Sequence, residues 1–170
     1  RLCRDWSSDV CSSDLVRVDM LRSVAAASGS AGMAGGQAMD LAAEGKSLDL
    51  AELELMHIYK TGALIRASVL LAAQSAPGLD AHKLTALDRY AKCVGLAFQI
   101  QDDILDVAGE TAKLGKLAGA DSARNKPTYP SILGLERSRA RALELRDDAL
   151  HALATFNAAA EPLGILRENH

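Results

Sequence analysis

Cysteines and aromatic residues are both scarce in this sequence, and their scarcity narrows the possible folds. Three cysteines occur in 170 residues, at Cys3, Cys11 and Cys93, and aromatic residues make up 4%. An odd number of cysteines without a CxxC spacing indicates neither a disulfide framework nor a zinc site, so a reducing cytoplasm is the expected location. The mainly apolar stretch at 67–73, which contains one serine, is far shorter than the roughly 20 residues of a membrane span. No signal-peptide pattern opens the chain, so we expect neither a leader of that kind nor a span.

An excess of positive charge is also absent. The formal net charge is -3, with 49% hydrophobic and 24% charged residues. Proteins that bind nucleic acid present basic faces to the phosphate backbone, so this balance argues against nucleic acid as a partner. Any phosphate chemistry would depend on a few placed cations or on a bound metal. The length suits one domain with a real core.

The first fifteen residues differ from the rest of the chain. They contain the only tryptophan, and the sequence of Ser7–Val10 recurs almost unchanged as Ser12–Leu15. Their apolar residues follow neither a strand nor a helix period. We therefore predict that residues 1–15 are a non-native or disordered leader, with a polar N-terminal arm as the alternative, and that residues 16–170 form one domain.

From residue 16 onward, the composition predicts helices. Alanine and leucine dominate and runs of β-branched residues are missing. Glycine and proline mark the breaks, and Asp49 and Asp80 are expected to cap helices. The predicted helices cover residues 16–27, 31–43, 50–76, 81–108 and 131–158, with a polar loop at 109–126. Short connections between long helices predict an all-α antiparallel bundle.

The strongest local signal is an acidic motif on an apolar helix. Residues four apart share a helix face, so Asp102 and Asp106 lie together, with Gln99 on the same face and Asp103 at its border. Unpaired carboxylates in an apolar stretch are costly. A divalent cation such as Mg²⁺, held by one or two carboxylates plus phosphate oxygens, would neutralise them. The alternative is a solvated acidic face, which the flanking apolar residues disfavour.

Cationic and glycine motifs add weaker signals. Lys60 and Thr61 precede a glycine in the middle of a predicted helix, where alanine would be about 1 kcal/mol better. Such a glycine often marks a kink, from which a lysine and a hydroxyl could reach an anion. The alternative is a lysine on the surface. Lys116 and Lys126 follow the acidic helix in the polar loop, and three glycines at 32–36 indicate either close helix packing or a poorly formed helix.

Together these motifs resemble the trans-prenyl diphosphate synthase family. Five segments occur in the family's order: GMAGGQAMDL, YKTGALI, GLAFQIQDDILD, LGK and KPTYP. The resemblance covers residues 16 to about 148, and the first motif is similar to that of the farnesyl and geranylgeranyl branch. It implies an isoprenoid synthase fold and a homodimer.

The resemblance also implies a role for individual residues. Asp102, Asp103 and Asp106 match the second aspartate-rich motif, which serves the Mg²⁺ that grips an allylic diphosphate, dimethylallyl or geranyl. Lys60, Lys116 and Lys126 match the lysines that contact this diphosphate, and Thr61 and Gln99 match polar residues of the allylic site. The family reaction ionises the allylic diphosphate, and isopentenyl diphosphate attacks the cation. Lys60 and Asp102 are the residues expected to support catalysis, by stabilising charge on the leaving group.

One departure from the family pattern is important. No DDxxD or DDxxxxD precedes Gly32, although the family carries its first aspartate-rich motif there. We therefore expect this chain to be the C-terminal part of an enzyme, inactive alone. Two alternatives stay open at this point. One is a non-catalytic partner subunit of a prenyl synthase, which would not need the intact DDILD. The other is a plain helical interaction module.

Overall fold

The structure is a computed structural model that describes residues 14–76, 79–114 and 127–156, with side chains of α5 described as far as Val107. In these residues the chain forms helices and turns without a strand, which confirms the all-α prediction. The elements are α1 (Asp14–Ser28), α2 (Met33–Ala43), α3 (Leu50–His57), the π-helical turn η1 (Ile58–Gly62), α4 (Ala63–Ser75), α5 (Ala81–Leu114), α6 (Tyr129–Leu133), α7 (Leu135–Ala152) and the 3-10 turn η2 (Leu153–Thr155).

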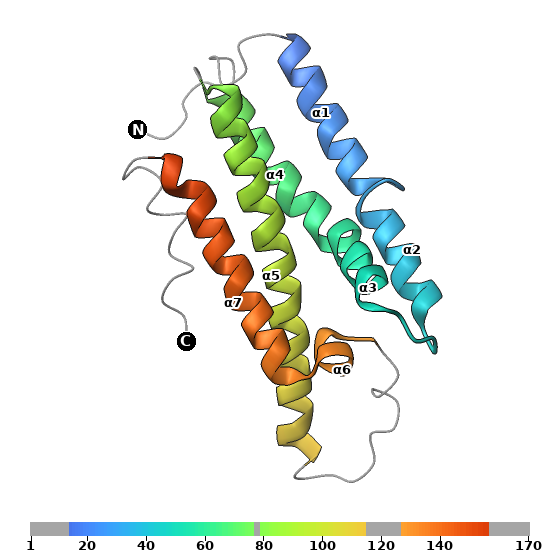
Figure 1. The fold of residues 1–170 in the computed structure, drawn as a ribbon. Helices are drawn as coiled ribbons and strands as arrows, with labels where there is room; N and C mark the ends of the chain where they lie inside the picture. Colours follow the sequence, from blue (N-terminus) through green and yellow to red (C-terminus); the bar gives the residue numbers. More distant parts are fainter. Residues whose placement is uncertain (1–13, 77–78, 115–126, 157–170) are drawn as a thin grey trace.

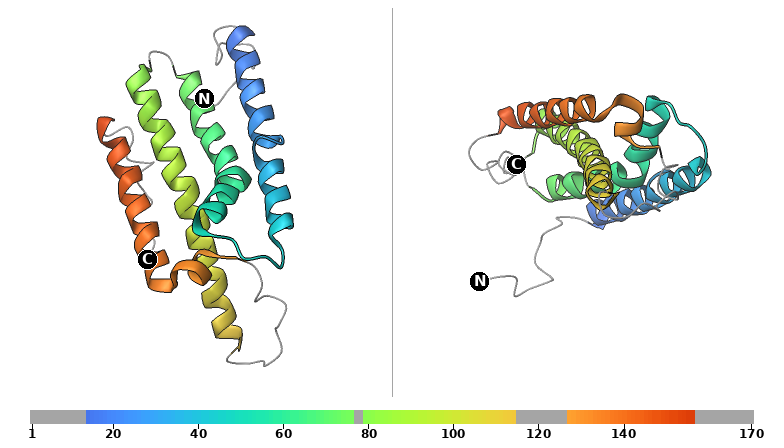
Figure 2. Two further views of the ribbon diagram at one scale, coloured as in Figure 1. Left: turned by 45° about the vertical axis from the view of Figure 1, so that its right-hand side comes forward. Right: turned by 90° about the horizontal axis from the view of Figure 1, so that it is seen from below.

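The long helices run antiparallel to one another (Figure 1). In the left view of Figure 2, α7 lies beside α5, α5 beside α4, and α4 beside α1. Helix α2 continues the direction of α1 and packs against η1, while α6 lies near the far end of α5 and contacts both α5 and α7. Among the described residues, no helix is long and apolar enough to cross a membrane.

The caps predicted from the sequence are present. The side chain of Asp49 accepts a hydrogen bond from the Glu52 backbone N–H at 2.8 Å, and the Glu52 side chain accepts one from the Asp49 N–H at 2.9 Å. Asp80 accepts a hydrogen bond from the Lys83 N–H at 2.8 Å, and this bond lowers the pKa of its carboxyl. Both contacts satisfy N–H groups that a first helical turn leaves without partners, so α3 and α5 begin where predicted.

Two predicted boundaries were wrong. Helix α5 continues to Leu114, whereas a loop was expected from Gly109. A single glycine costs only about 1 kcal/mol in a helix, and the residues after it are good helix formers. The predicted helix 131–158 is broken at Gly134, whose positive φ of 82° ends α6 and begins α7. A capping box between Thr128 and Ser131 starts α6 earlier than expected.

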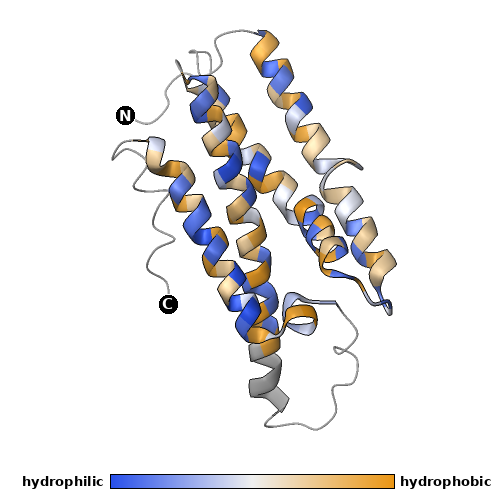
Figure 3. Cartoon of the chain, in the orientation of Figure 1, coloured by the Kyte–Doolittle hydropathy of each residue, from blue (hydrophilic) through white to orange (hydrophobic). Residues whose placement is uncertain are grey.

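The core consists of two clusters along α5. The first joins α3, α5, α6 and α7 through Leu53, Met56, Leu96, Ile100, Ile104, Tyr129 and Leu145. The second joins α4, α5 and the end of α7 through Ala73, Leu87, Tyr90, Ala149, Ala152 and Leu153. Helix α7 is hydrophilic over much of the face in view in Figure 3, and it buries a narrow apolar stripe against α5. Helix α5 is therefore the element on which the other parts of the bundle are assembled.

Asp88 on α5 links that helix to α4 through Arg66. Its carboxylate accepts a hydrogen bond from the Arg66 guanidinium and lies 2.7 Å from Lys92 Nζ. Burial opposes ionisation of Asp88, but the hydrogen bonds from Lys92 and Arg66 outweigh it and lower the pKa of the carboxyl. A lowered pKa in the folded state stabilises the fold above the unfolded-state pKa, and this stabilisation is lost as pH falls through the folded-state pKa.

We therefore expect the stability difference between the wild-type chain and Asp88→Asn to depend on pH. At neutral pH the variant should unfold more easily, by about 0.2–1 kcal/mol, because the link is partly exposed to solvent. Below the ordinary aspartate pKa of about 3.9 the difference should shrink, since the wild-type carboxyl also becomes neutral. Urea denaturation of both proteins at several pH values measures this difference in the free energy of unfolding. A difference that stays constant to low pH would contradict the role of the Asp88 charge.

Candidate active site

The predicted kink at Lys60–Thr61–Gly62 is a π-helical turn. Residues Ile58–Gly62 form η1 between α3 and α4, while the backbone keeps helical dihedral angles on both sides. A π turn inserts one extra residue into a helix and is frequently found at functional sites, because it changes the direction of the side chains that it carries. The structure thus confirms that the helix 50–76 is interrupted at this motif, and the interruption carries Lys60 and Thr61.

Helix α2 holds η1 from one side. At Gly36 the two backbones are so close that an added Cβ would lie 2.1 Å from the Lys60 nitrogen. One turn further along α2, the Asp40 carboxylate accepts a hydrogen bond from Lys60 Nζ, and both side chains are largely shielded from solvent. Of the two explanations for the glycines at 32–36, Gly36 supports close packing. Asp40 was not singled out from the sequence, although it lies on the same helix face as Gly36.

Helix α5 holds η1 from the other side. The Thr61 hydroxyl donates a hydrogen bond of 2.6 Å to Gln99 Oε1, and Gln99 Nε2 makes a longer contact of 3.5 Å with Asp102 Oδ2. Gln99 is buried, whereas Asp102 is exposed. Gly95, one turn before Gln99, lies against Gly62, and a Cβ on Gly95 would be 3.1 Å from the Gly62 Cα. The absence of a side chain at Gly95 lets α5 and η1 approach closely enough for this line from Thr61 to Asp102 to form.

The three aspartates of the acidic motif have different surroundings. Asp102 and Asp106 lie one turn apart on α5, as their spacing of four predicts. Both are exposed, contrary to the expectation that the flanking apolar residues would shield them, because Phe98 and Leu105 are themselves exposed. Asp103 is 9% exposed and turned inward, where its Oδ2 accepts a hydrogen bond from the Tyr129 backbone N–H at 2.9 Å. In the part of the chain that the structure describes, no group of three acidic, histidine or cysteine side chains is placed to hold a metal. The three-aspartate metal site therefore stays a prediction.

Asp103 also lies against His57, the last residue of α3. His57 Nε2 is 3.4 Å from Asp103 Oδ2, and the His57 ring stacks on the Tyr129 ring with centroids 5.8 Å apart. Burial raises the pKa of Tyr129, and the nearby Glu54 carboxylate raises it further. Sequence analysis assigned no role to His57 or Tyr129. The available signal was their position, because His57 lies two residues before the YKTGALI motif and Tyr129 is the tyrosine of the KPTYP motif.

Two predicted site residues, Lys116 and Lys126, lie outside the described residues. An apolar pocket of about 520 Å³ lies between the α3–α4 segment and α5, and it is lined in part by Leu55, Tyr59 and Leu96. Lys60, Thr61, Gln99 and Asp102 do not line it. The polar line and this pocket are therefore separate features, although adjacent residues of η1 contribute to both.

Comparisons with known proteins agree on one family. The family model described as polyprenyl synthetase matches residues 10–158. Farnesyl diphosphate synthase of Escherichia coli K12 is 56% identical over 141 residues, which cover 83% of this chain and 47% of that protein. The chain therefore spans about half the length of the curated relatives it matches.

Solved structures show the same likeness. An FPP/GFPP synthase from Zymomonas mobilis superposes with a TM-score of 0.77 at 35% identity, covering 91% of this chain and 50% of that one. A geranyltransferase from Helicobacter pylori, solved in complex with magnesium and isoprenyl diphosphate, gives a TM-score of 0.70 at 31% identity, covering 92% of this chain and 50% of that one. The residues matched by the family model, 10–158, include α2, η1 and the acidic motif on α5.

Proposed function

The chain belongs to the polyprenyl synthetase family, and we propose that it supplies the allylic-diphosphate side of a short-chain trans-prenyltransferase of the farnesyl diphosphate synthase type. The substrates would be dimethylallyl or geranyl diphosphate and isopentenyl diphosphate. The observation that carries the proposal is the line from Thr61 through Gln99 to Asp102, which begins at the π turn beside Lys60. This line joins a hydroxyl on η1 to an exposed carboxylate on α5, and the adjacent Lys60 adds a cation on η1, so the groups that a diphosphate–metal site requires come from neighbouring elements.

Lys60 and Thr61 would position the diphosphate. An ammonium group has three N–H donors, so Lys60 can keep its hydrogen bond to Asp40 while donating to phosphate oxygens. Asp40 thus holds the lysine in place before the substrate arrives, which lowers the entropy cost of forming the site. The Thr61 hydroxyl gives its one hydrogen to Gln99 Oε1 in this structure, so it would have to turn from Gln99 to a phosphate oxygen when the diphosphate binds. Lys116 and Lys126 belong to the proposal as further diphosphate contacts.

The exposed carboxylates fit a hard divalent cation. Mg²⁺ is usually bound by one or two carboxylates, with water and phosphate oxygens completing the octahedron. Asp102 and Asp106 offer two carboxylates one helical turn apart, with Asp102 as the first candidate. The metal would supply charge stabilisation for the leaving diphosphate. Asp103, the third predicted ligand, has the buried contacts described above.

Homodimer formation and a cytoplasmic location are parts of the same proposal. Helix α1 exposes several apolar side chains, including Val18 (49% exposed) and Leu21 (70% exposed), and none of its residues is buried. Exposed apolar surface of this kind commonly marks a protein interface. A second copy of the chain is the partner proposed to cover it.

A hybrid enzyme tests the proposed function. We expect the 170-residue chain alone to give no prenyl transfer, because it carries one aspartate-rich motif and no DDxxD before Gly32. A hybrid in which residues 16–156 of this chain replace the corresponding segment of the Escherichia coli protein should carry out transfer, since the two proteins are 56% identical over 141 residues. The assay incubates each protein with Mg²⁺, geranyl diphosphate and labelled isopentenyl diphosphate, and then extracts the farnesyl product.

The assay distinguishes a catalytic chain from a non-catalytic subunit. Labelled product from the chain alone would show that the second motif is sufficient for transfer. A hybrid that folds as a dimer but makes no product would contradict the proposed function and favour a non-catalytic subunit. The unaltered Escherichia coli enzyme is the positive control, and light scattering of the hybrid reports its assembly.

A further inference from the structure

Asp103 occupies the centre of a buried polar cluster between α3, α5 and α6. Its carboxylate contacts the Tyr129 N–H at 2.9 Å and lies 3.4 Å from His57 Nε2. Tyr129 is the first residue of α6, and its N–H is one of those that a first helical turn leaves without an intrahelical acceptor. A carboxylate at this position accepts a charge-assisted hydrogen bond from the backbone.

The same carboxylate is connected to the π turn. His57 ends α3 immediately before η1, and its ring is 5% exposed. Tyr129 is fully buried and stacks on His57 with an interplanar angle of 10°. Asp103 thereby holds the Tyr129 backbone while the Tyr129 ring packs against the residue that leads into Lys60 and Thr61. Three elements that carry or border the proposed site meet at this one side chain.

We propose that Asp103 is a positioning residue that sets η1 and α6 against the acidic helix, and that its carboxylate does not bind the metal. The inference rests on the function proposed above, because the site that it positions is that one. Asp102 and Asp106 are exposed and available for a cation, whereas the described contacts of Asp103 point into the protein. The two neighbouring aspartates thus have different roles, because Asp102 binds the cation and Asp103 holds η1 and α6 in position.

The proposal predicts different behaviour for two substitutions of the same residue. Asp103→Asn keeps an oxygen that can accept the Tyr129 N–H, and its amide group can donate to a neutral His57 nitrogen. Asp103→Ala removes both contacts and leaves the buried Tyr129 N–H without this acceptor. If Asp103 is a metal ligand, both substitutions should weaken metal binding. If Asp103 is a positioning residue, the Asn substitution should retain what the Ala substitution loses.

The experiment uses the ¹⁵N-labelled 170-residue chain with saturating inorganic diphosphate, which supplies the phosphate oxygens that the proposed site needs. Mn²⁺ is then added, because it accepts the same oxygen ligands as Mg²⁺ and broadens nearby NMR signals. For Asp103→Ala we expect the Tyr129 amide signal to shift, the Lys60 and Thr61 signals to move, and about tenfold more Mn²⁺ to be needed to broaden Asp102. For Asp103→Asn the Tyr129 signal, the Lys60 and Thr61 signals and the required Mn²⁺ concentration should all be close to those of the wild-type chain. Asp102→Asn should lose the Mn²⁺ effect while the Tyr129 signal stays in place.

A second variant separates positioning from general loss of stability. Leu153→Ala removes packing in the other core cluster, away from Asp103. It should lower the denaturation midpoint without moving the Lys60 and Thr61 signals. The proposal is overturned if Leu153→Ala reproduces the Asp103→Ala spectrum, if Asp103→Ala leaves Tyr129 unmoved, or if Asp103→Asn loses Mn²⁺ binding as Asp102→Asn does. Absence of Mn²⁺ broadening in the wild-type chain would instead reject the metal site of the proposed function, and the positioning role with it.

Discussion

Asp102→Asn in the hybrid enzyme should lower the rate of prenyl transfer by about 10²–10³-fold, the usual cost of removing one preorganised electrostatic contact. The substitution keeps the shape of the side chain and removes its charge. Asp102 is exposed, and its one described contact is the 3.5 Å approach of Gln99 Nε2, so the fold should tolerate the change. The loss should therefore appear in the rate, with little change in the denaturation midpoint.

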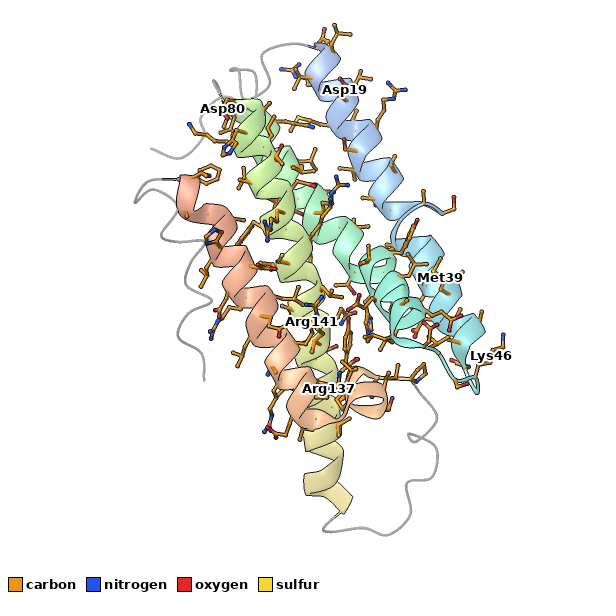
Figure 4. The ribbon with its side chains drawn as sticks, in the orientation of Figure 1. Asp19, Met39, Lys46, Asp80, Arg137 and Arg141 are labelled. Atoms are coloured by element: carbon orange, nitrogen blue, oxygen red, sulfur yellow. The ribbon has the colours of Figure 1, made fainter. Side chains whose placement is uncertain are left out.

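Asp80→Asn provides the matched control for this substitution. Asp80 caps the start of α5, at the other end of the helix from α6 (Figure 4). Asparagine is as good an N-cap as aspartate, so the helix start should be preserved. Both variants remove one negative charge from the same helix, and only Asp102→Asn should affect catalysis. Equal rates for the two variants would mean that the Asp102 carboxylate has no part in the reaction.

Sequence reasoning succeeded where the determinants are local. The caps at Asp49 and Asp80 and the break at the KTG segment depend on residues within one or two turns. Helical spacing and capping chemistry are sufficient to predict such features. The helical class followed from composition for the same reason, because each segment favours a helix by itself.

Sequence reasoning failed where competing local preferences were close in energy. Gly109 and Gly134 are both single glycines in helix-favouring surroundings. Helix α5 continues through Gly109, whereas the helix ends at Gly134. Tyr129 accounts for part of the difference, since its burial and its bond to Asp103 place α6 across the bundle. A turn with positive φ at Gly134 is then needed for α7 to pack along α5.

The site contacts missed from the sequence are long-range. Asp40 and Lys60 are twenty residues apart, and Asp103 and Tyr129 are separated by twenty-six. The spacing of residues within one helix does not show which side chains of other helices they will contact. It was for this reason that Asp103 was placed at the border of the acidic face, although the structure turns it toward α6.

Gly36→Ala should destabilise the chain by about 1–3 kcal/mol, the typical cost of overpacking. Its Cβ would lie 2.1 Å from the Lys60 nitrogen and 2.5 Å from the Lys60 Cα. These are backbone atoms within a helical turn, so no side-chain rotation can relieve the clash. The better helix propensity of alanine returns only about 0.5–1 kcal/mol. Helix α2 must therefore move away from η1, and the Asp40–Lys60 hydrogen bond should be lost with it.

Gly62→Ala separates this backbone clash from a general effect of replacing glycine. Gly62 has helical dihedral angles, and the nearest atom to its added Cβ is the His57 carbonyl oxygen at 3.6 Å, an ordinary contact. That substitution should be neutral or stabilising by up to about 1 kcal/mol. Urea denaturation of both variants gives the comparison, and the hybrid enzyme reports whether Gly36→Ala also lowers prenyl transfer. Equal stability of the two variants would show that α2 can separate from η1 without cost, and that Asp40 does not depend on this close approach to hold Lys60.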